Sequence, residues 1–404
     1  MTVTSVEPYR EVVFDKDGDG PAGQAGFLAA LARQGCTDLV LFTHGWNNSP
    51  SVANGLFDRF LQPFPSVTGP GVRLGYAGLV WPSMMFSDEP VPDFPALAAV
   101  VPERAATIGR LAELVEEEPP QEAAFAEFAA LLRDLTDIDQ EGLVSTGAPG
   151  FLLGDPRAVY GMFADAQQGS AGAPDSSDAP TEESLFGADR AKRLWKGARE
   201  ALRQATYYTM KRRAGVVGER GLGPLLGELA RTAPGLRVHL VGHSFGGRLV
   251  AHALRGLPAG ARNVKSVTLL QGAFSHYAFA ARLPHAQDHG GSLRDLQSRV
   301  DGPLVACHSH HDTALRVFYP LASRLSRDDH SLLGQEDRRW WAIGYDGVQA
   351  VPATTTRTLA TALRDGVPAT GCVSVDTAQV VSEHSDICHE ELARLVARAG
   401  RFGG

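Results

Sequence analysis

The chain has few cysteines and no long hydrophobic run. Its 404 residues include only four cysteines, and none of them has the C-x-x-C spacing of zinc and redox motifs. Cys307 and Cys372 lie in apolar stretches, where buried free thiols are common. No apolar run approaches the roughly 20 residues that span a bilayer, and the first residues lack the basic and apolar regions of a secretion signal. We therefore expect a cytoplasmic protein without transmembrane segments.

The sequence also lacks an excess of positive charge. Lysine and arginine total 38 against 46 aspartate and glutamate residues, for a formal net charge of −8 at pH 7. Nucleic-acid binding requires a basic face, so we expect no nucleic-acid partner. The one basic cluster, Lys211-Arg212-Arg213, ends a helical pattern, where cations suit the helix dipole. With 44% hydrophobic and 21% charged residues, the composition is that of an ordinary globular protein.

Motifs for a bound metal are incomplete. Residues 15–20 read D-x-D-x-D-G, like the first half of a calcium-binding EF-hand loop, but Gly26 occupies the place of the glutamate ligand. A charged turn is the better interpretation. The polar clusters at 308–312 and 383–389 invite a zinc interpretation, yet neither has H-E-x-x-H spacing. We expect no metal and no cofactor.

Strand and helix patterns alternate along most of the chain. This alternation implies an α/β fold with a mainly parallel central sheet and helices on both faces. Functional side chains then belong in loops at the carboxyl ends of the strands. The predicted strands are 10–14, 37–42, 72–81, 236–241, 264–270, 304–307 and 371–375. The predicted helices are 24–33, one starting at Ser49-Pro50, 188–213, 223–232 and one starting at Cys388.

The alternation lapses between residues 84 and 187. Two amphipathic helices are predicted there, at 103–117 and 121–135. Residues 167–183, rich in Gly, Ala, Ser, Asp and Pro, predict a flexible linker. We therefore expect a core formed by residues 1–83 and 188–404, with a mostly helical cap inserted at 84–187.

The most informative motif is G-x-S-x-G at residues 242–246, between a predicted strand and a predicted helix. This pattern places Ser244 on a tight, strained turn, with its hydroxyl clear of the backbone. The backbone N–H of Phe245 then points to where an oxyanion would form. A helix cap in a nucleotide-binding fold is the alternative interpretation of Ser244, but we recognise no G-x-G-x-x-G in the sequence, and glycine-rich phosphate loops lack this serine apex. We interpret Ser244 as a nucleophile.

A second loop completes the pattern for acyl transfer. The strand at 37–42 runs into His44-Gly45-Trp46, and a His-Gly turn in this place is typical of loops that supply a second oxyanion donor. The glycine lets the loop bend, so that the N–H of Trp46 faces the nucleophile. We expect His44 to pack and form hydrogen bonds instead of reacting.

A serine nucleophile needs a base, and the base needs a carboxylate that holds its tautomer. Hydrolases with such a turn follow the chain order Ser, Asp or Glu, His, which fits Asp312 and His384, each in a loop after a predicted strand. The alternatives stay open: Asp301 flanks the same strand as Asp312, and Asp312 could instead cap the next helix. His389 competes with His384, although it falls within the closing helix pattern.

Together these motifs resemble the α/β-hydrolase superfamily, in particular its lipase- and esterase-like serine hydrolases. The similarity lies in His44-Gly45-Trp46, in Gly-His-Ser-Phe-Gly-Gly at 242–247 and in His384-Ser385-Asp386, and it covers residues ~10–82 and ~188–400. The resemblance implies Ser244 as nucleophile, Asp312 as acid and His384 as base, with Trp46 and Phe245 as oxyanion donors. It does not cover the predicted cap, where substrate choice usually resides.

Three functions from two classes follow from these expectations. The first is a serine hydrolase that cleaves a small-molecule carboxylic ester or thioester through an acyl-enzyme on Ser244. The second is an acyltransferase or thioesterase of a biosynthetic pathway on the same fold. The third is a non-catalytic binding protein that retains the pocket, which a large distance between Ser244 Oγ and any imidazole nitrogen would favour.

Overall fold

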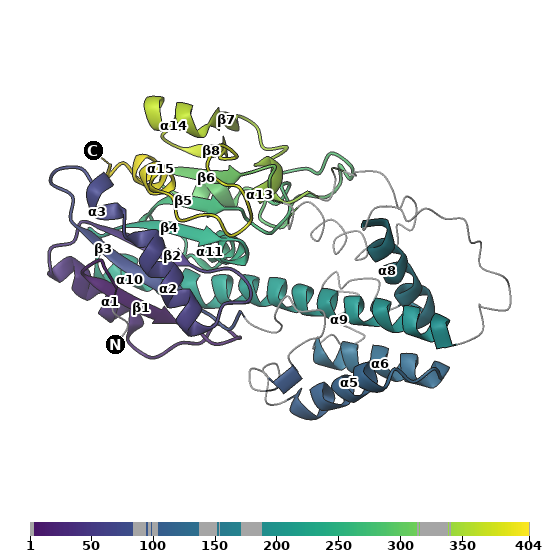
Figure 1. The fold of residues 1–404 in the computed structure, drawn as a ribbon. Helices are drawn as coiled ribbons and strands as arrows, with labels where there is room; N and C mark the ends of the chain where they lie inside the picture. The colour runs from purple at the N-terminus through teal and green to yellow at the C-terminus, as the bar shows by residue number, and fades with distance from the viewer. Residues whose placement is uncertain are drawn as a thin grey trace. The chain divides into compact units, whose positions relative to one another are not determined.

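Eight strands of the described chain form one wholly parallel sheet in the computed structural model (Figure 1). The structure describes residues 4–83, 104–136, 154–170, 188–312 and 341–403, with residues 94, 95, 98, 152, 315 and 338. The strand order is β1-β3-β2-β4-β5-β6-β8-β7, and every neighbouring pair is parallel. The strands are β1 Tyr9–Val13, β2 Asp38–Thr43, β3 Leu74–Val80, β4 Arg237–His243, β5 Val264–Leu270, β6 Pro303–His308, β7 Thr355–Thr358 and β8 Gly371–Asp376. The prediction of an α/β fold with a parallel sheet is confirmed.

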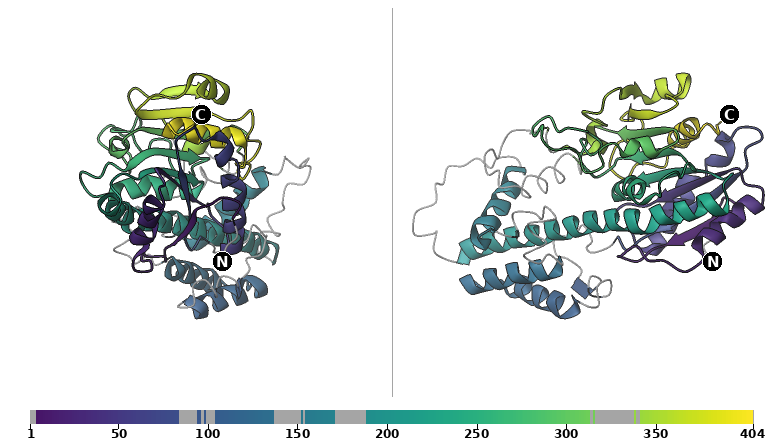
Figure 2. Two further views of the ribbon diagram at one scale, coloured as in Figure 1. Left: turned by 90° about the vertical axis from the view of Figure 1, so that its left-hand side faces the viewer. Right: turned by 180° about the vertical axis from the view of Figure 1, so that it is seen from behind.

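Helices cover both faces of this sheet (Figures 1 and 2). One face carries α2 Pro50–Leu61, α3 Phe64–Val67, α14 Leu359–Asp365 and α15 Glu390–Gly400, which share a hydrophobic core with the strands. The other face carries α1 Gln24–Arg33, α10 Gly223–Thr232 and α11 Phe245–Gly256. A short helix, α13 Ile343–Asp346, and a 3₁₀ turn, Leu296–Arg299, lie in loops.

Strand β2 illustrates why the central strands were recognisable in the sequence. All of its residues are buried, because helices pack against both faces of the sheet. On one face the ring of Phe42 lies 4.3 Å from that of Phe60 and 5.6 Å from that of Phe57, both on α2. Neighbouring residues point to the opposite face, so a doubly covered strand is a continuous apolar run in the sequence.

Several elements of the core differ from the prediction. The strand β7 and the helix α14 were not predicted. The strand was missed because it is a short edge strand of sequence Thr-Thr-Arg-Thr with half of its residues exposed. A π-helix, Val217–Leu222, connects α9 (Ala188–Val216) to α10. The pattern of apolar residues there had suggested only two separate α-helices.

The chain divides into two compact units. The first comprises Met1–Ser83, Lys211–Pro320 and Asp337–Gly404, and the second includes the described residues of Met84–Met210. The boundary therefore falls within α9, between Met210 and Lys211.

The second unit is helical. Besides most of α9 it contains α5 Ala105–Glu117, α6 Glu122–Leu135 and α8 Pro156–Ser170. Its core is aromatic: the ring of Trp195 lies 5.0 Å from that of Phe125 and 5.4 Å from that of Phe128. The helix α8 corrects the predicted linker at its start, because residues 167–170 are helical. The rest of that linker lies outside the described residues.

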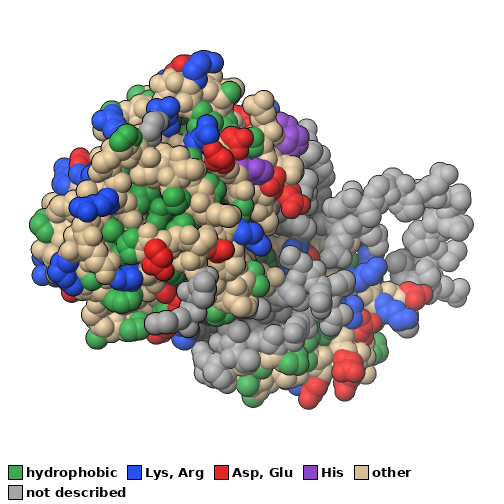
Figure 3. Space-filling model, turned by 60° about the vertical axis from the view of Figure 1, so that its left-hand side comes forward, with side chains coloured by type: hydrophobic (Ala, Val, Ile, Leu, Met, Phe, Trp, Pro, Cys, Tyr) green, Lys and Arg blue, Asp and Glu red, His purple; other side chains and the backbone are tan. Residues whose placement is uncertain are grey.

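The surface carries charges of both signs. Basic and acidic side chains are scattered over the described part of the face drawn in Figure 3. Within the described part of the chain, no helix is long and apolar enough to cross a membrane.

Candidate active site

Ser244 occupies a strained turn between β4 and α11. Its φ of 55° and ψ of −117° lie in a region that side-chain-bearing residues rarely adopt. Its N–H donates to the carbonyl of Leu270, the last residue of β5, at 2.9 Å. A Cβ on Gly246 would lie 2.5 Å from the carbonyl oxygens of Thr43 and His44, so only glycine lets α11 approach the end of β2 this closely. Ser244 therefore lies on a tight and strained turn.

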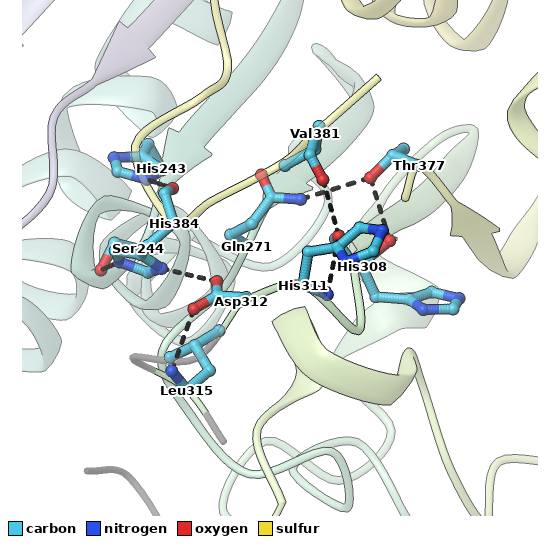
Figure 4. Close-up of polar contacts among 11 residues, drawn as sticks. His243, Ser244, Gln271, His308, His311, Asp312, Leu315, Thr377, Val381 and His384 are labelled. Atoms are coloured by element: carbon cyan, nitrogen blue, oxygen red, sulfur yellow. Dashed lines mark hydrogen bonds and ion pairs between the residues drawn. The ribbon is translucent and has the colours of Figure 1, made fainter. Parts of the chain in front are cut away.

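Three predicted side chains lie in direct contact (Figure 4). His384 Nε2 lies 2.8 Å from Ser244 Oγ, and His384 Nδ1 lies 2.6 Å from Asp312 Oδ2. A carboxylate accepts hydrogen bonds, so Nδ1 carries the proton and Nε2 is free to accept one from the serine hydroxyl. Asp312 is wholly buried, whereas His384 is partly exposed.

The competing candidates lie elsewhere. Asp301 precedes β6 and pairs with Lys265 at 2.5 Å on the surface, at the end of the strand opposite to Asp312. His389 is the residue before α15, and its Nε2 lies 2.6 Å from Asp386 Oδ1. Asp312 also accepts a hydrogen bond from the N–H of Leu315 through Oδ1 at 3.0 Å, while its other oxygen holds His384.

The loop that carries His384 is organised by Asp386. One oxygen of Asp386 accepts hydrogen bonds from Ser382 N–H and Ser382 Oγ–H at 2.9 and 2.7 Å, and the other binds His389. Burial opposes the charged form, but these hydrogen bonds outweigh it and lower the pKa of Asp386. The aspartate of the His-Ser-Asp motif thus holds the loop in shape and does not contact Ser244 in this structure.

Further polar contacts join the loop after β6 to the loop after β8. Ser309 Oγ–H donates to the carbonyl of Val381 at 2.8 Å. Thr377 donates from both its N–H and its Oγ–H to the carbonyl of His308, each at 2.9 Å. The buried Gln271 in turn donates to Thr377 Oγ at 3.3 Å (Figure 4). Residues 308 and 309 belong to the cluster that invited a zinc interpretation, whereas Gln271 and Thr377 were not predicted as site residues. Their only signal in the sequence is a polar residue directly after a buried strand.

The turn formed by His44, Gly45 and Trp46 lies directly against Ser244. A Cβ on Gly45 would lie 2.9 Å from Ser244 Cβ, so any larger residue would push the turn away. The ring of Trp46 lies 6.2 Å from that of Phe245, the residue after the serine.

His44 stabilises this turn and is fully buried. Its Nδ1–H donates to the carbonyl of Gly45 at 2.9 Å, and its Nε2 accepts from the N–H of Trp81 at 3.3 Å. The Trp81 indole N–H donates to the carbonyl of His44 at 3.0 Å, and the two rings stack. Burial lowers the pKa of His44 to about 4, which keeps the ring neutral and suited to this pair of hydrogen bonds. The expectation that His44 packs and forms hydrogen bonds fits these contacts.

The Asp15–Gly20 segment forms a charged turn. Asp15 Oδ1 accepts hydrogen bonds from the N–H groups of Asp17 and Asp19 at 2.9 and 2.8 Å. Residues 18–23 match G-x-G-x-x-G ahead of α1, which the sequence analysis overlooked. A phosphate would need the backbone N–H groups of this motif, but the carboxylate of Asp15 already binds that of Asp19. The described residues contain no group of three or more His, Cys, Asp or Glu side chains placed to hold a metal ion.

Comparisons with protein-family models, with curated proteins and with solved structures returned no match to this chain.

Proposed function

We propose that the protein is a serine hydrolase of the α/β-hydrolase type, which cleaves carboxylic esters or thioesters through an acyl-enzyme on Ser244. The observation that carries the proposal is the hydrogen-bonded series Ser244 Oγ, His384 and Asp312, with contacts of 2.8 and 2.6 Å. Contacts of this length between a nucleophile, a base and an orienting carboxylate are characteristic of activated serines.

The proposed reaction has two halves. In the first, Ser244 Oγ attacks the acyl carbon while His384 Nε2 takes the hydroxyl proton, and His384 then gives that proton to the leaving alcohol or thiol. In the second, His384 removes a proton from the water that attacks the acyl carbon. It then returns this proton to Ser244 Oγ as the bond between Oγ and the acyl carbon breaks, which releases the acid and restores the free enzyme. Asp312 holds the His384 tautomer and stabilises the ring while it is positively charged.

The proposed oxyanion hole consists of the backbone N–H groups of Trp46 and Phe245. The support for it is the close approach of Gly45 to Ser244, with 2.9 Å between the Ser244 Cβ and a Cβ built on the glycine. Phe245 is also the first residue of α11, and the positive end of a helix dipole suits developing negative charge. Loss of one such donor typically costs about 10²–10³ in rate.

The alternative functions are supported less well. A large distance between Ser244 Oγ and any imidazole nitrogen would favour a non-catalytic binding protein. The contact of 2.8 Å between Ser244 Oγ and His384 Nε2 argues against that function. An acyltransferase or thioesterase would use the same three residues, and in acyl transfer another acceptor would take the place of water. The choice of substrate by a cap at 84–187, the cytoplasmic location and the absence of a nucleic-acid partner stay predictions from the sequence.

A fluorophosphonate probe tests the proposal. We expect covalent labelling of Ser244, identified by mass spectrometry of the tryptic peptides, and hydrolysis of p-nitrophenyl esters across a series of acyl chain lengths. Ser244→Ala should lose both. Ser385→Ala is the matched control, because Ser385 is an exposed neighbour of His384, and it should retain both. Equal labelling of wild type and Ser244→Ala would refute the mechanism.

A further inference from the structure

The histidine that precedes the nucleophile contacts the residue that carries the base. His243 is the last residue of β4 and is nearly buried. Its Nε2 lies 2.8 Å from the backbone carbonyl oxygen of His384, 141 residues further along the chain. A carbonyl oxygen can only accept, so the proton of His243 is on Nε2 and its Nδ1 is unprotonated.

This hydrogen bond gives His384 a second attachment. The His384 ring is held at Nδ1 by Asp312, which lies in the loop after β6. One contact at Nδ1 leaves the ring free to pivot, and the position of Nε2 then depends on where the backbone lies. The bond from His243 fixes that backbone to β4, the strand that directly precedes Ser244, so the nucleophile and its base are attached to a common element.

We propose that His243 is a positioning residue, which holds His384 Nε2 in line with Ser244 Oγ through its hydrogen bond to the His384 carbonyl. This assignment rests on the proposed hydrolase function and adds a residue to its site. His243 contacts neither Ser244 Oγ nor Asp312 in the described contacts, and it acts through the backbone of the base.

The electrostatics of His243 suit this role. Burial, together with the proximity of His384, lowers the pKa of His243 to about 3, so its ring is neutral near pH 7. The ring centroids of His243 and His384 are 5.0 Å apart. A neutral ring at this distance does not oppose the positive charge that His384 acquires when it takes the serine proton, whereas a lysine or arginine donor would.

The other edge of His243 packs against the turn that bears Trp46. A Cβ on Gly45 would lie 3.1 Å from His243 Nδ1, and Nδ1 has no hydrogen-bond partner within the described part of the chain. The ring therefore fits between the base loop and the proposed oxyanion loop. The size of the ring suits this space, and its single N–H reaches the His384 carbonyl.

Two substitutions separate the hydrogen bond from the packing. His243→Gln places an amide N–H the same number of bonds from Cα as Nε2, whereas His243→Met has the same reach without a donor. We expect His243→Met to lower kcat, and the rate of fluorophosphonate labelling, by about 10²-fold, because small displacements of a reacting group cost that much. KM should change little, since substrate contacts are kept. His243→Gln should recover most of the loss.

Thermal unfolding of each variant checks that the rates are measured on folded protein. If His243→Met does not fold, the test is the comparison of His243→Gln with wild type. The assignment of His243 would be overturned if His243→Met had the rate of wild type. It would also be overturned if His243→Gln lost as much activity as is expected for His243→Met. Either result would leave the proposed hydrolase function in place. A wild-type protein that is not labelled at Ser244 would overturn the proposed function and this assignment with it.

Discussion

At the scale of single residues, Asp312 shows how one side chain combines a structural and a proposed catalytic role. Oδ1 accepts from the N–H of Leu315 at 3.0 Å, and Oδ2 accepts from His384 Nδ1 at 2.6 Å. Both oxygens are used and the side chain is fully buried. The two contacts hold the carboxylate in one orientation, so the orientation of the His384 ring follows from that of the turn at Asp312.

We expect Asp312→Asn to lower kcat by up to about 10⁴-fold, because an amide in place of Oδ2 can donate to His384 Nδ1 and favours the wrong tautomer. Ester hydrolysis at pH 8 measures the effect. Asp301→Asn is the control, since Asp301 flanks the same strand but pairs with Lys265 on the surface, and its activity should match wild type. Similar losses in the two variants would contradict the role of Asp312.

At the scale of elements, the helix that follows the nucleophile is packed tightly against the π-helix. A Cβ on Gly218 would lie 2.2 Å from the carbonyl oxygen of Leu249, and one on Gly256 would lie 1.8 Å from that of Glu219. The two backbones are therefore in contact without intervening side chains. Because α11 begins at the residue after Ser244, this packing fixes the direction in which the helix leaves the turn.

Gly218→Ala should lower the free energy of unfolding by about 1–3 kcal/mol, as overpacking of a close-packed contact does. Urea unfolding followed by circular dichroism at pH 7.5 measures the change. Gly235→Ala provides the control, because a Cβ there would meet no heavy atom within 4 Å, and its stability should stay within about 0.5 kcal/mol of wild type. A Gly218→Ala protein as stable as this control would show that the contact is not tight.

At the scale of the whole molecule, several buried histidines are held neutral. Burial lowers the pKa of His44 to about 4 and that of His243 to about 3, and it also lowers the pKa values of His239 and His252. An unfolded histidine titrates near 6.5. Below that pH the histidines of the unfolded chain take up protons that those of the folded chain do not. The contribution of these buried histidines to the free energy of unfolding is therefore present above pH 6.5 and is lost as the pH falls.

His252 on α11 is a suitable test of this pH dependence, because its Nε2 has no hydrogen-bond partner among the described residues. We expect His252→Leu to flatten the fall in unfolding free energy between pH 6.5 and 5 by up to about 1.4 kcal/mol per pH unit. Urea titrations at several pH values measure this slope. His289→Leu, at a site with 69% of the side chain exposed, should keep the wild-type slope. An unchanged slope in His252→Leu would mean that this ring is protonated in the folded protein.

Much of the fold could be predicted because its signals are local. The helices Gln24–Arg33 and Gly223–Thr232 and the strand Val264–Leu270 were predicted with their observed bounds. In these segments the apolar residues recur with the period of the element. The strand Thr355–Thr358 was missed because its stability comes from pairing with β8 and not from its own side chains.

The sequence by itself determined that this chain is an α/β protein with reactive residue types after its strands. That information lies in apolar periodicity and in turn residues, which act over a few neighbouring positions. Only the tertiary structure decided which of these residues meet: His384 and not His389 lies at Ser244, and His243 holds the His384 backbone. The partners of the first contact are 140 residues apart, and such distances depend on how the strands order themselves in the sheet, which no local pattern contains.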